Sequence, residues 1–537
     1  MSILDLRWNM RCCILITFVF LLTIRGFSAD ESEIFAERPE IYFRFLIQSR
    51  AEIGTITRIV SIDNVVDDTV YAYANRSEFD RFKALQKSYE ILTPPALMQK
   101  IKMSDRAIKS YGWDSYPTYP AYRDMMYRFA DDYPAICRID SIGASVQGRG
   151  IFFAVITDNV QSEEAEPEVM YTATMHGDET TGYILMLRLV DYLLSNYAID
   201  KQVTSLVDHL EIWINPLANP DGTYFNGDST VFGATRSNAN GVDLNRNFPD
   251  PEQGEHPDGN AWQPETIAMM ELAERQNFVL SANFHGGTEV LNYPWDCKPT
   301  RHADDDWLIR LCRQYADTVH AHSPTGYLSD QNNGITNGYE WCEIHGGRQD
   351  YMTYYQHGRE VTIEISDIKM PAATDIGLYW EYNRAALLNY LAAALSGIRG
   401  EIRADDLNTL RISIVGHEQD NSWAIPDRDF GDFYRFCLPG VYSLQITDGA
   451  ASVLFETVSV RESQATRIHM KIGAAAPGDV NADGSMDVAD VVLIRNYIDG
   501  RLQPDSEAAE AADWNGDGII DRVDLERILQ FLEYLVP

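Results

Sequence analysis

Cysteine is scarce in this chain of 537 residues. Of the seven cysteines, Cys12 and Cys13 lie in an apolar segment near the N-terminus, which leaves five for the rest of the chain. Five is an odd number and too few for a disulfide scaffold, so at least one thiol is free or pairs between chains. The fold must therefore depend on hydrophobic cores, and a chain of this length is expected to form three or four domains.

Basic residues are also few: 44 Lys and Arg stand against 80 Asp and Glu, and the net charge is −36. Nucleic-acid binding needs clustered Lys and Arg to contact phosphates, so this composition argues against that class of function. The acidic excess suits an extracellular protein with calcium sites, although a solvated acidic surface accounts for most of the charge equally well.

Long hydrophobic runs are absent apart from Cys12–Ile24, which follows Arg7 and Arg11 and precedes the small residues of Gly26–Ala29. The run is short for a membrane span and has the flanks of a signal peptide, so residues 1–29 are expected to be cleaved. An uncleaved anchor is the alternative. We expect a secreted protein, extracellular or attached to the cell surface through a scaffold, with no membrane segment after cleavage.

Residues 30–105 contain three short apolar runs (Ile41–Ile47, Ile56–Val60 and Thr69–Ala72), then a helical pattern at 77–92 and a break at Pro94-Pro95. This pattern predicts a small α+β unit. The sequence leaves open whether the unit is a propeptide or a permanent part of the protein.

Residues 110–398 alternate between amphipathic helices and short apolar strands. Such alternation predicts an α/β fold with a mixed, mostly parallel sheet and helices on both faces, and ligands are expected outside the carboxyl ends of the strands. Residues 399–473 contain only strand-length runs, which predict a β-sandwich. Residues 474–477 read as a linker before residues 478–537.

Several polar side chains fall where the predicted strands end. His176 and Glu179 follow one apolar run, and His285 ends another; two imidazoles and a carboxylate with an open fourth position are typical of catalytic zinc. The His176–Glu179 pair alone is a weak signal, since such pairs are more often ordinary surface contacts. His345 also precedes two glycines, but no buried strand delivers it.

Further polar residues strengthen this interpretation. Arg236, Asn245 and Arg246 lie in polar loops, where arginines bind carboxylates or form structural salt bridges. Glu364 lies within an apolar strand, where a carboxylate is costly unless it is paired or lies beside a metal.

The chain resembles the zinc carboxypeptidases over about residues 110–473, and within them the regulatory branch, which carries a transthyretin-like β-sandwich after the catalytic domain. The resemblance rests on the ordered motifs HGDE, NPDG, Arg236, DLNRNFPD, FHGG, NYPWD, NG, GGRQD and TIEIS. It implies one catalytic zinc on His176, Glu179 and His285; Glu364 as general base and acid; Arg236 polarising the scissile carbonyl; and Asn245 and Arg246 holding the substrate carboxylate.

The chain departs from the family at one position. The family's mobile tyrosine is replaced by Cys342, which puts its substrate-capping hydrogen bond in doubt while zinc ligands and base remain. Asp296 and Gln349 match residues that line the side-chain pocket in the regulatory branch. A carboxylate there would favour C-terminal Lys or Arg, although Asp296 could equally be a structural residue of its turn.

Residues 478–537 contain two loops 34 residues apart with oxygen ligands at regular spacing. This is the pattern of calcium loops, and each precedes one helix, so the pair resembles a small α-helical dockerin that binds two calcium ions and a cohesin domain. A calcium-stabilised structural tail is the alternative. The proposed calcium-binding positions are Asp479, Asn481, Asp483, Ser485, Asp487, Asp490, Asp513, Asn515, Asp517, Ile519, Asp521 and Asp524.

The leading hypothesis is a secreted zinc carboxypeptidase that removes C-terminal residues from peptides or proteins with a free C-terminus and is displayed in a polysaccharide-degrading complex. A cell-wall peptide hydrolase or amide deacylase on the same scaffold is the second. A non-catalytic binding protein displayed through the dockerin is the third, and the intact ligand set and base argue against it.

Overall fold

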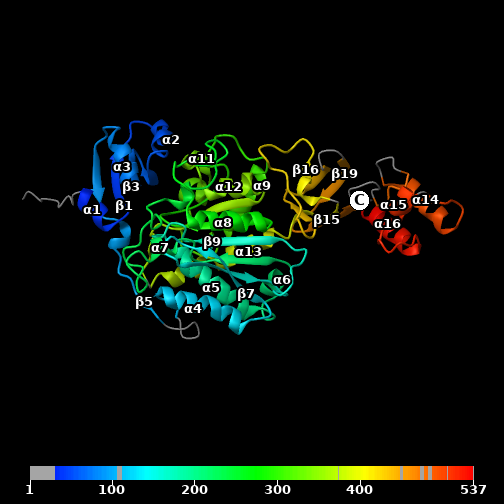
Figure 1. Cartoon of the computed structure of the whole chain (residues 1–537), viewed down its shortest axis with the longest axis horizontal. Coiled ribbons are helices and arrows are strands. Elements are labelled where there is room, and N and C mark those ends of the chain that lie inside the picture. The colour runs from blue at the N-terminus through cyan, green and yellow to red at the C-terminus, as the bar shows by residue number, and fades with distance from the viewer. Residues whose placement is uncertain are drawn as a thin grey trace, which may run out of the picture.

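The computed structural model describes residues 31–105, 112–372, 374–404, 406–447, 452–471, 477–481, 486–504 and 506–535. The expected signal segment, most of the expected linker and two expected calcium ligands, Asp483 and Ser485, lie outside these residues. The units follow one another along the long axis of the molecule, from the N-terminal unit to the C-terminal helices (Figure 1). No helix within the described residues is long and apolar enough to cross a membrane. The five described cysteines are all free thiols.

The N-terminal unit, residues 31–104, is built on an antiparallel four-stranded sheet of order β2-β3-β1-β4. Its core consists of aromatic and aliphatic side chains such as Phe43, Phe79 and Phe82. Its main elements are α1 (Glu31–Glu37), β1 (Glu40–Leu46), α2 (Ile53–Ile56), β2 (Ser61–Val66), β3 (Thr69–Asn75), α3 (Arg76–Lys83) and β4 (Tyr89–Leu92).

The apolar run Ile56–Val60 is the end of α2 and a turn, and the strand begins at Ser61. One local expectation for this unit was wrong in part. The expected helix over 77–92 ends at Lys83, because Gln86 adopts a φ of +56° and Tyr89–Leu92 pair with β1. At Tyr89–Leu92, pairing across the sheet overrode the local pattern.

The central unit contains an eight-stranded sheet of order β13-β12-β14-β11-β9-β10-β8-β7. The neighbours β14, β11, β9 and β10 are parallel, while β12, β8 and β7 join antiparallel, so the mixed, mostly parallel sheet is confirmed. The strands are β7 (Cys137–Ala144), β8 (Gly150–Ile156), β9 (Glu168–Ala173), β10 (Glu211–Asn215), β11 (Phe278–His285), β12 (Thr288–Tyr293), β13 (Ile335–Asn337) and β14 (Arg359–Ser366).

Helices cover both faces of this sheet and bury a separate apolar cluster on each. Helix α5 (Thr181–Asn196) is apolar nearly all round, because α4, α6 and α13 enclose it against the sheet. One face carries α4 (Tyr119–Asp132), α5, α6 (Lys201–Val207), α9 (Asp305–His320) and α13 (Ile376–Ala393), and the other carries α8 (Pro264–Arg275) and α12 (Arg348–Tyr354). Shorter elements are β5 (Met103–Ser104), β6 (Tyr116–Pro117), α7 (Pro220–Thr223), α10 (Asp330–Gly334) and α11 (Gly338–Trp341).

The next segment forms two three-stranded sheets, β17-β15-β20 and β16-β18-β19, which share one apolar core. Strands β15 and β20 pair in parallel, and the other neighbours are antiparallel. The strands are β15 (Gly397–Arg403), β16 (Arg411–Ile414), β17 (Asp432–Arg435), β18 (Gly440–Thr447), β19 (Ser452–Val460) and β20 (Ala465–Lys471).

The C-terminal helices are α14 (Val488–Ile498), α15 (Ser506–Ala512) and α16 (Arg522–Leu535), and they pack around Ile494 and Ile528. Helices α14 and α16 begin within the last residues of the two expected calcium loops. Asp490 and Asp524, the last residues of the two loops, are fully buried and accept hydrogen bonds from backbone N–H groups of their own loops.

A buried ionic cluster joins the paired sheets to the central unit. Arg435 of β17 donates from both terminal nitrogens to Asp304, with N–O distances of 2.9 Å, and one of them also reaches Glu418 at 2.9 Å. Arg359 donates to the same Asp304 carboxylate at 2.8 Å. Arg435 is fully buried and Asp304 is only 3% exposed, so water cannot replace a lost partner.

Removing one partner of this cluster should therefore destabilise the protein. We expect Arg435→Met to lower the free energy of unfolding by about 3–5 kcal/mol, the range for breaking a buried ion pair. The control is Arg310→Met, which removes the exposed Arg310–Glu462 pair between the same two units and should cost about 0–1 kcal/mol. Denaturant unfolding measures both, and equal effects of the two variants would contradict the prediction.

Candidate active site

The carboxyl ends of the parallel strands bring distant residues together. Strand β11 ends at His285, and its register with β14 pairs His285 directly with Glu364. Strand β9 lies on the other side of β11 and ends at Ala173, just before His176 and Glu179. Side chains that are widely separated in sequence therefore meet at one edge of the sheet, as expected for this class of fold.

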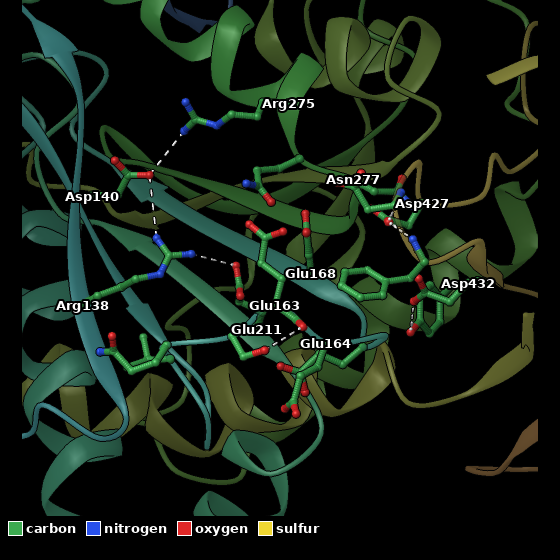
Figure 2. Close-up of a pocket in the computed structure, with 18 residues that line it drawn as sticks. Arg138, Asp140, Glu163, Glu164, Glu168, Glu211, Arg275, Asn277, Asp427 and Asp432 are labelled. Carbon is green, nitrogen blue, oxygen red and sulfur yellow. Dashed lines mark hydrogen bonds and ion pairs between the residues drawn. The ribbon is translucent and has the colours of Figure 1, made fainter. Parts of the chain in front are cut away.

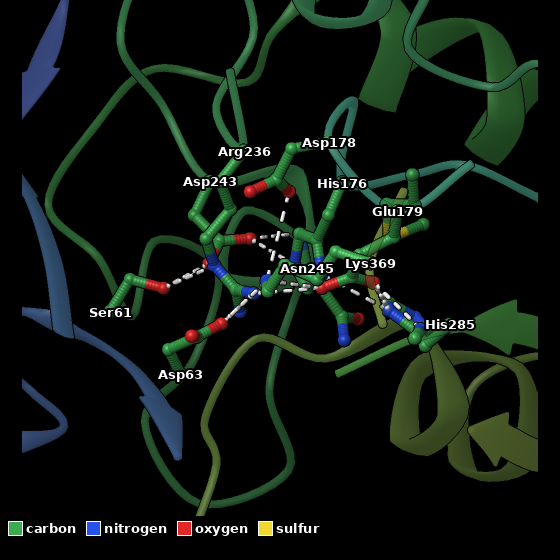
Figure 3. Close-up of polar contacts among 12 residues, drawn as sticks. Ser61, Asp63, His176, Asp178, Glu179, Arg236, Asp243, Asn245, His285 and Lys369 are labelled. Atoms are coloured by element: carbon green, nitrogen blue, oxygen red, sulfur yellow. Dashed lines mark hydrogen bonds and ion pairs between the residues drawn. The ribbon is translucent and has the colours of Figure 1, made fainter. Parts of the chain in front are cut away.

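His176, Glu179 and His285 converge into a buried cluster (Figure 3). The two Nδ1 atoms lie 3.1 Å apart, and the Glu179 carboxylate lies 3.0 Å from His176 and 2.9 Å from His285. Burial lowers the pKa of His285 to about 4, which keeps its imidazole in the neutral form that binds metals. This donor set of two imidazoles and one carboxylate fits zinc, and it is the only convergent group of this kind among the described residues.

Residues that the sequence analysis did not single out support this cluster. Asp243 lies 3.0 Å from Nε2 of His176 and so orients the ring from the side away from the cluster. Lys369 Nζ lies 2.9 Å from Glu179. Gly177 is required by close packing, because a Cβ there would lie 2.4 Å from the backbone of Gly222. The DLNRN motif contained the signal for Asp243, whereas nothing in the local sequence marked Lys369.

The Oε2 atom of the Glu364 side chain is buried and has no hydrogen-bond partner within the described residues. Burial raises the pKa of the Glu364 carboxyl well above its usual range, and the neighbouring Glu179 carboxylate raises it further. A carboxyl group that is desolvated and has an unpartnered oxygen beside a metal site is suited to accepting and returning a proton.

Arg236, Asn245, Arg246 and Asp296 line the same cavity as the metal cluster, whereas Gln349 is not among its lining residues. Arg236 Nη1 lies 3.2 Å from Glu179, and its Nε lies 3.1 Å from Asp243. Arg246 donates to the backbone oxygen of Asn245 at 2.8 Å, while its buried Nε has no partner in the described part of the chain. Arg236 therefore lies at the metal cluster, and Asn245 and Arg246 form a second polar group in the cavity.

Asp296 and Gln349, which the resemblance assigned to the side-chain pocket, contact each other. Gln349 Nε2 donates to Asp296 Oδ1 at 2.8 Å, and Asn292 donates to the same oxygen at 3.2 Å. Asp296 lines the cavity, and burial together with the neighbouring Asp350 raises its pKa well above the usual range. Gln349 also accepts a hydrogen bond from the backbone of Thr362 on β14, which fixes the pair.

Cys342 lines the cavity at the position where the family has its tyrosine, and the described lining residues include Trp341 but no tyrosine. Burial raises the pKa of the Cys342 thiol to about 11, so the thiol is neutral. His345 contacts Asp250 and Glu343 rather than the metal cluster, which agrees with its exclusion as a ligand.

The N-terminal unit covers the mouth of this cavity, whose volume is about 70 Å³. Glu40 accepts hydrogen bonds from the backbone N–H groups of Arg236 and Ser237 at 2.8 and 2.9 Å. Asp63 of β2 reaches the metal cluster, where its carboxylate lies 3.4 Å from Arg236 and 2.6 Å from Lys369. Nothing in the local sequence indicated these contacts, because they join residues that are 173 positions apart or more.

A larger cavity of about 310 Å³ lies at the opposite, amino ends of the strands, between the central unit and the paired sheets (Figure 2). Its wall is strongly acidic, and burial raises the pKa of Glu166 to about 7 and that of Asp432 to about 6. Arg138 and Arg275 both pair with Asp140. Its described acidic groups do not converge as metal ligands do, so this cavity lacks the arrangement found at the other edge of the sheet.

Comparisons with known proteins agree with this geometry. A zinc carboxypeptidase family model matches residues 122–386, and a type I dockerin model matches residues 477–533. Carboxypeptidase M of Mus musculus is 35% identical over 338 residues, 59% of this chain and 74% of that protein. The carboxypeptidase N catalytic chain of Homo sapiens is 32% identical over 396 residues, 66% of this chain and 84% of that protein.

The mouse carboxypeptidase D is 35% identical over 376 residues, but this match spans only 26% of its length. Among solved structures, the carboxypeptidase A of Helicoverpa armigera aligns with a TM-score of 0.50 at 18% identity, covering 67% of this chain and 99% of that one, which supports the fold. The chain belongs to the zinc carboxypeptidase family, is related to its regulatory branch of carboxypeptidases M, D and N, and carries a type I dockerin domain at residues 477–533.

Proposed function

We propose that this metallocarboxypeptidase hydrolyses the last peptide bond of peptides or proteins, with His176, Glu179 and His285 holding one zinc ion. The observation that carries the proposal is the buried convergence of these three groups beside Glu364, whose buried Oε2 atom has no hydrogen-bond partner in the described residues. A non-catalytic binding protein would have no need of an unpaired carboxyl at this place, because its burial costs free energy.

The roles of the remaining residues follow from where they lie. Bound zinc supplies a Lewis acid that polarises the scissile carbonyl and acidifies water. Glu364 takes the proton of the attacking water and returns it to the leaving nitrogen. Arg236 donates to the carbonyl oxygen as negative charge develops there, and Asn245 and Arg246 bind the terminal carboxylate.

Asp296 and Gln349 favour substrates that end in Lys or Arg. The Asp296 carboxyl lines the cavity and has only amide donors, from Asn292 and Gln349, as side-chain hydrogen-bond partners among the described residues. A basic C-terminal side chain would provide the missing charge partner and hold Asp296 ionised. A wall-peptide hydrolase remains the alternative substrate class, since such peptides also end in a free carboxylate.

Replacing the base tests the catalytic assignment. Glu364→Gln keeps the size of the side chain but cannot accept the proton, so we expect kcat to fall by roughly 10²-fold or more with zinc retained. The measurement is release of the last residue from blocked peptides ending in Lys, Arg, Phe or diaminopimelate, with and without chelator, alongside metal analysis.

The exposed Asp367→Asn, three residues later, is the matched control and should keep near-normal turnover. Near-normal turnover by Glu364→Gln would exclude Glu364 as the base. The same peptide series measures the preference for the C-terminal residue. Release of Lys or Arg no faster than release of Phe would contradict the assignment of Asp296.

The N-terminal unit acts as an inhibitory cover that must be displaced before substrate enters. Asp63 forms an ion pair with Arg236, the residue that the proposed mechanism needs for the scissile carbonyl. Residues 62–65 of β2 line the cavity beside the metal cluster. Glu40 and Ser61 add hydrogen bonds to Arg236, Ser237 and Asp243, so the cover is held by polar groups of the site itself.

Weakening this cover should activate the enzyme. Asp63→Ala removes a largely buried carboxylate between two cations, which should destabilise the covered state by about 2 kcal/mol or more, or roughly 30-fold in its population relative to the open state. We therefore expect higher peptidase activity of the full chain. Asp68→Ala, in the exposed turn after the same strand, is the control. Equal activity of the wild-type and Asp63→Ala chains would show that Asp63 does not restrain the site.

The dockerin anchors the enzyme, after secretion, to a cohesin of an extracellular scaffold by way of two calcium ions. The last residues of the two loops make the same contacts. The carboxylates of Asp490 and Asp524 each accept hydrogen bonds from backbone N–H groups at the start and at the end of their own loop. In the second loop, Asp513 and Asp517 also accept backbone N–H groups. This folded arrangement holds several carboxylates close together, and their repulsion favours a divalent cation.

Calcium titration of the full chain tests this part. We expect two bound calcium ions per chain by calorimetry, and one after Asp524→Asn, because the loop loses a charged oxygen ligand. Glu526→Gln, an exposed residue on the following helix, is the control and should bind two. Unchanged stoichiometry in Asp524→Asn would remove this residue from the calcium site, and peptidase activity should be the same in all three chains.

A further inference from the structure

Lys369 is a buried cation beside the metal cluster to which the proposed mechanism gives no role. It lies in the loop after β14, and its backbone oxygen accepts a hydrogen bond from Thr180 at 2.7 Å, which fixes the loop against the metal-binding segment. Its side chain is only 5% exposed. An ammonium group in such a place needs carboxylate partners, because an isolated buried charge is costly.

Three carboxylates surround this ammonium group. Lys369 Nζ lies 2.9 Å from Glu179, 3.7 Å from Asp178 and 2.6 Å from Asp63 (Figure 3). Glu179 and Asp178 belong to the central unit and stay with it, but Glu179 is committed to the metal in the loaded enzyme. Asp63 has the shortest contact of the three and belongs to the N-terminal cover.

Displacing the cover therefore leaves Lys369 without its nearest anion. The ring of Tyr73, whose centroid lies 5.2 Å from Nζ, leaves with the same unit. An ammonium group has three N–H donors and no acceptor, so the opened site presents a positive group that can bind an incoming carboxylate. Asp63, delivered on an extended strand, shows that a carboxylate carried by a peptide backbone fits this position.

The position of Lys369 indicates which part of a substrate it meets. Asn245 and Arg246, which bind the terminal carboxylate in the proposed function, contact none of the three metal-cluster residues among the described contacts. Lys369 contacts Glu179 directly. A substrate that is anchored by its C-terminus and has its scissile bond at the metal cluster therefore brings the residue before that bond towards Lys369.

We propose that Lys369 forms a binding subsite for an acidic residue at the penultimate position of the substrate, an inference that rests on the proposed carboxypeptidase function. Asp63 occupies this subsite in the covered enzyme. Peptides with Asp or Glu before the C-terminal residue are then preferred over peptides with a neutral residue there, and peptides with Lys there are the least favoured because of like-charge repulsion.

The test compares three blocked peptides that end in Arg and differ only in a penultimate Glu, Ala or Lys. The enzyme is the full chain carrying Asp63→Ala, before and after limited proteolysis, so that the subsite is vacated. We expect kcat/KM for the Glu peptide to be roughly tenfold higher than for the Ala peptide, about the effect of one partly buried charge pair, and the Lys peptide to be the slowest. Added salt should reduce the Glu-to-Ala ratio.

Adding Lys369→Met should bring the Glu-to-Ala ratio close to one, mainly through KM, while Lys369→Arg should keep most of it because the charge remains. A residue that merely balances the charge of Asp178 and Glu179 would alter zinc content and all three peptides together, without changing their ratio. Zinc analysis of each variant accompanies the kinetics. If Lys369→Met does not fold, the Lys369→Arg ratio and the salt dependence decide.

The outcomes separate this inference from the proposed function. Absence of zinc-dependent cleavage of all three peptides, in every preparation, contradicts the proposed function itself. Cleavage with a Glu-to-Ala ratio that is near one, or is independent of salt, or is unchanged by Lys369→Met, overturns the subsite and leaves the carboxypeptidase function standing.

Discussion

The convergence of two imidazoles and one carboxylate at the edge of the central sheet is the constraint on which the rest of the site depends. His176, Glu179 and His285 are buried within a few ångströms of one another, and the surrounding groups are arranged to support them. Asp243 orients one ring, and Arg236 and Lys369 place positive charge beside Glu179. Because buried charges are tolerated only in balance, the metal cluster determines which charged residues can surround it.

The same balance explains why the N-terminal unit fits over the site. Arg236 and Lys369 pair with Glu179, Asp243 and Asp178 of the central unit, and Asp63 of the N-terminal unit adds a further carboxylate that contacts both cations. In the proposed mechanism, the N-terminal cover and the substrate thus bind to the same two cations. The N-terminal cover and a bound peptide each provide negative charge beside these two buried cations.

The paired sheets and the C-terminal helices lie away from this chemistry. The sheets are joined to the central unit by Asp304, Arg359 and Arg435, a fully buried cluster at the opposite side from the metal residues. The dockerin has its own small core and its own loop hydrogen bonds. The structure therefore places the metal cluster and the dockerin in separate units, and the acidic cavity between the central unit and the paired sheets lies at the amino ends of the strands rather than at the carboxyl ends, where the metal cluster lies.

Much of the fold and of the metal cluster could be predicted from local residue patterns. The motif around His176, the strand that ends at His285 and the apolar strand with Glu364 predicted the sheet and its metal cluster, because strand periodicity and metal-ligand chemistry are local or nearly local properties. The repeated acidic loops likewise predicted the helices that follow them, α14 and α16. Where the sequence misled, within the expected helix over 77–92, pairing of Tyr89–Leu92 with β1 decided the backbone.

Only the tertiary structure decided what lies across the cavity. No periodicity links Asp63 to Arg236 or Lys369, since the contact depends on how a separate unit docks onto loops 170 to 300 residues later. The register of β11 against β14, which sets His285 beside Glu364, is likewise a property of the assembled sheet. The sequence by itself determined which chemical groups this protein possesses, and the packing of its units determined which of them face one another, because electrostatic and metal-binding contacts depend on distance in space rather than along the chain.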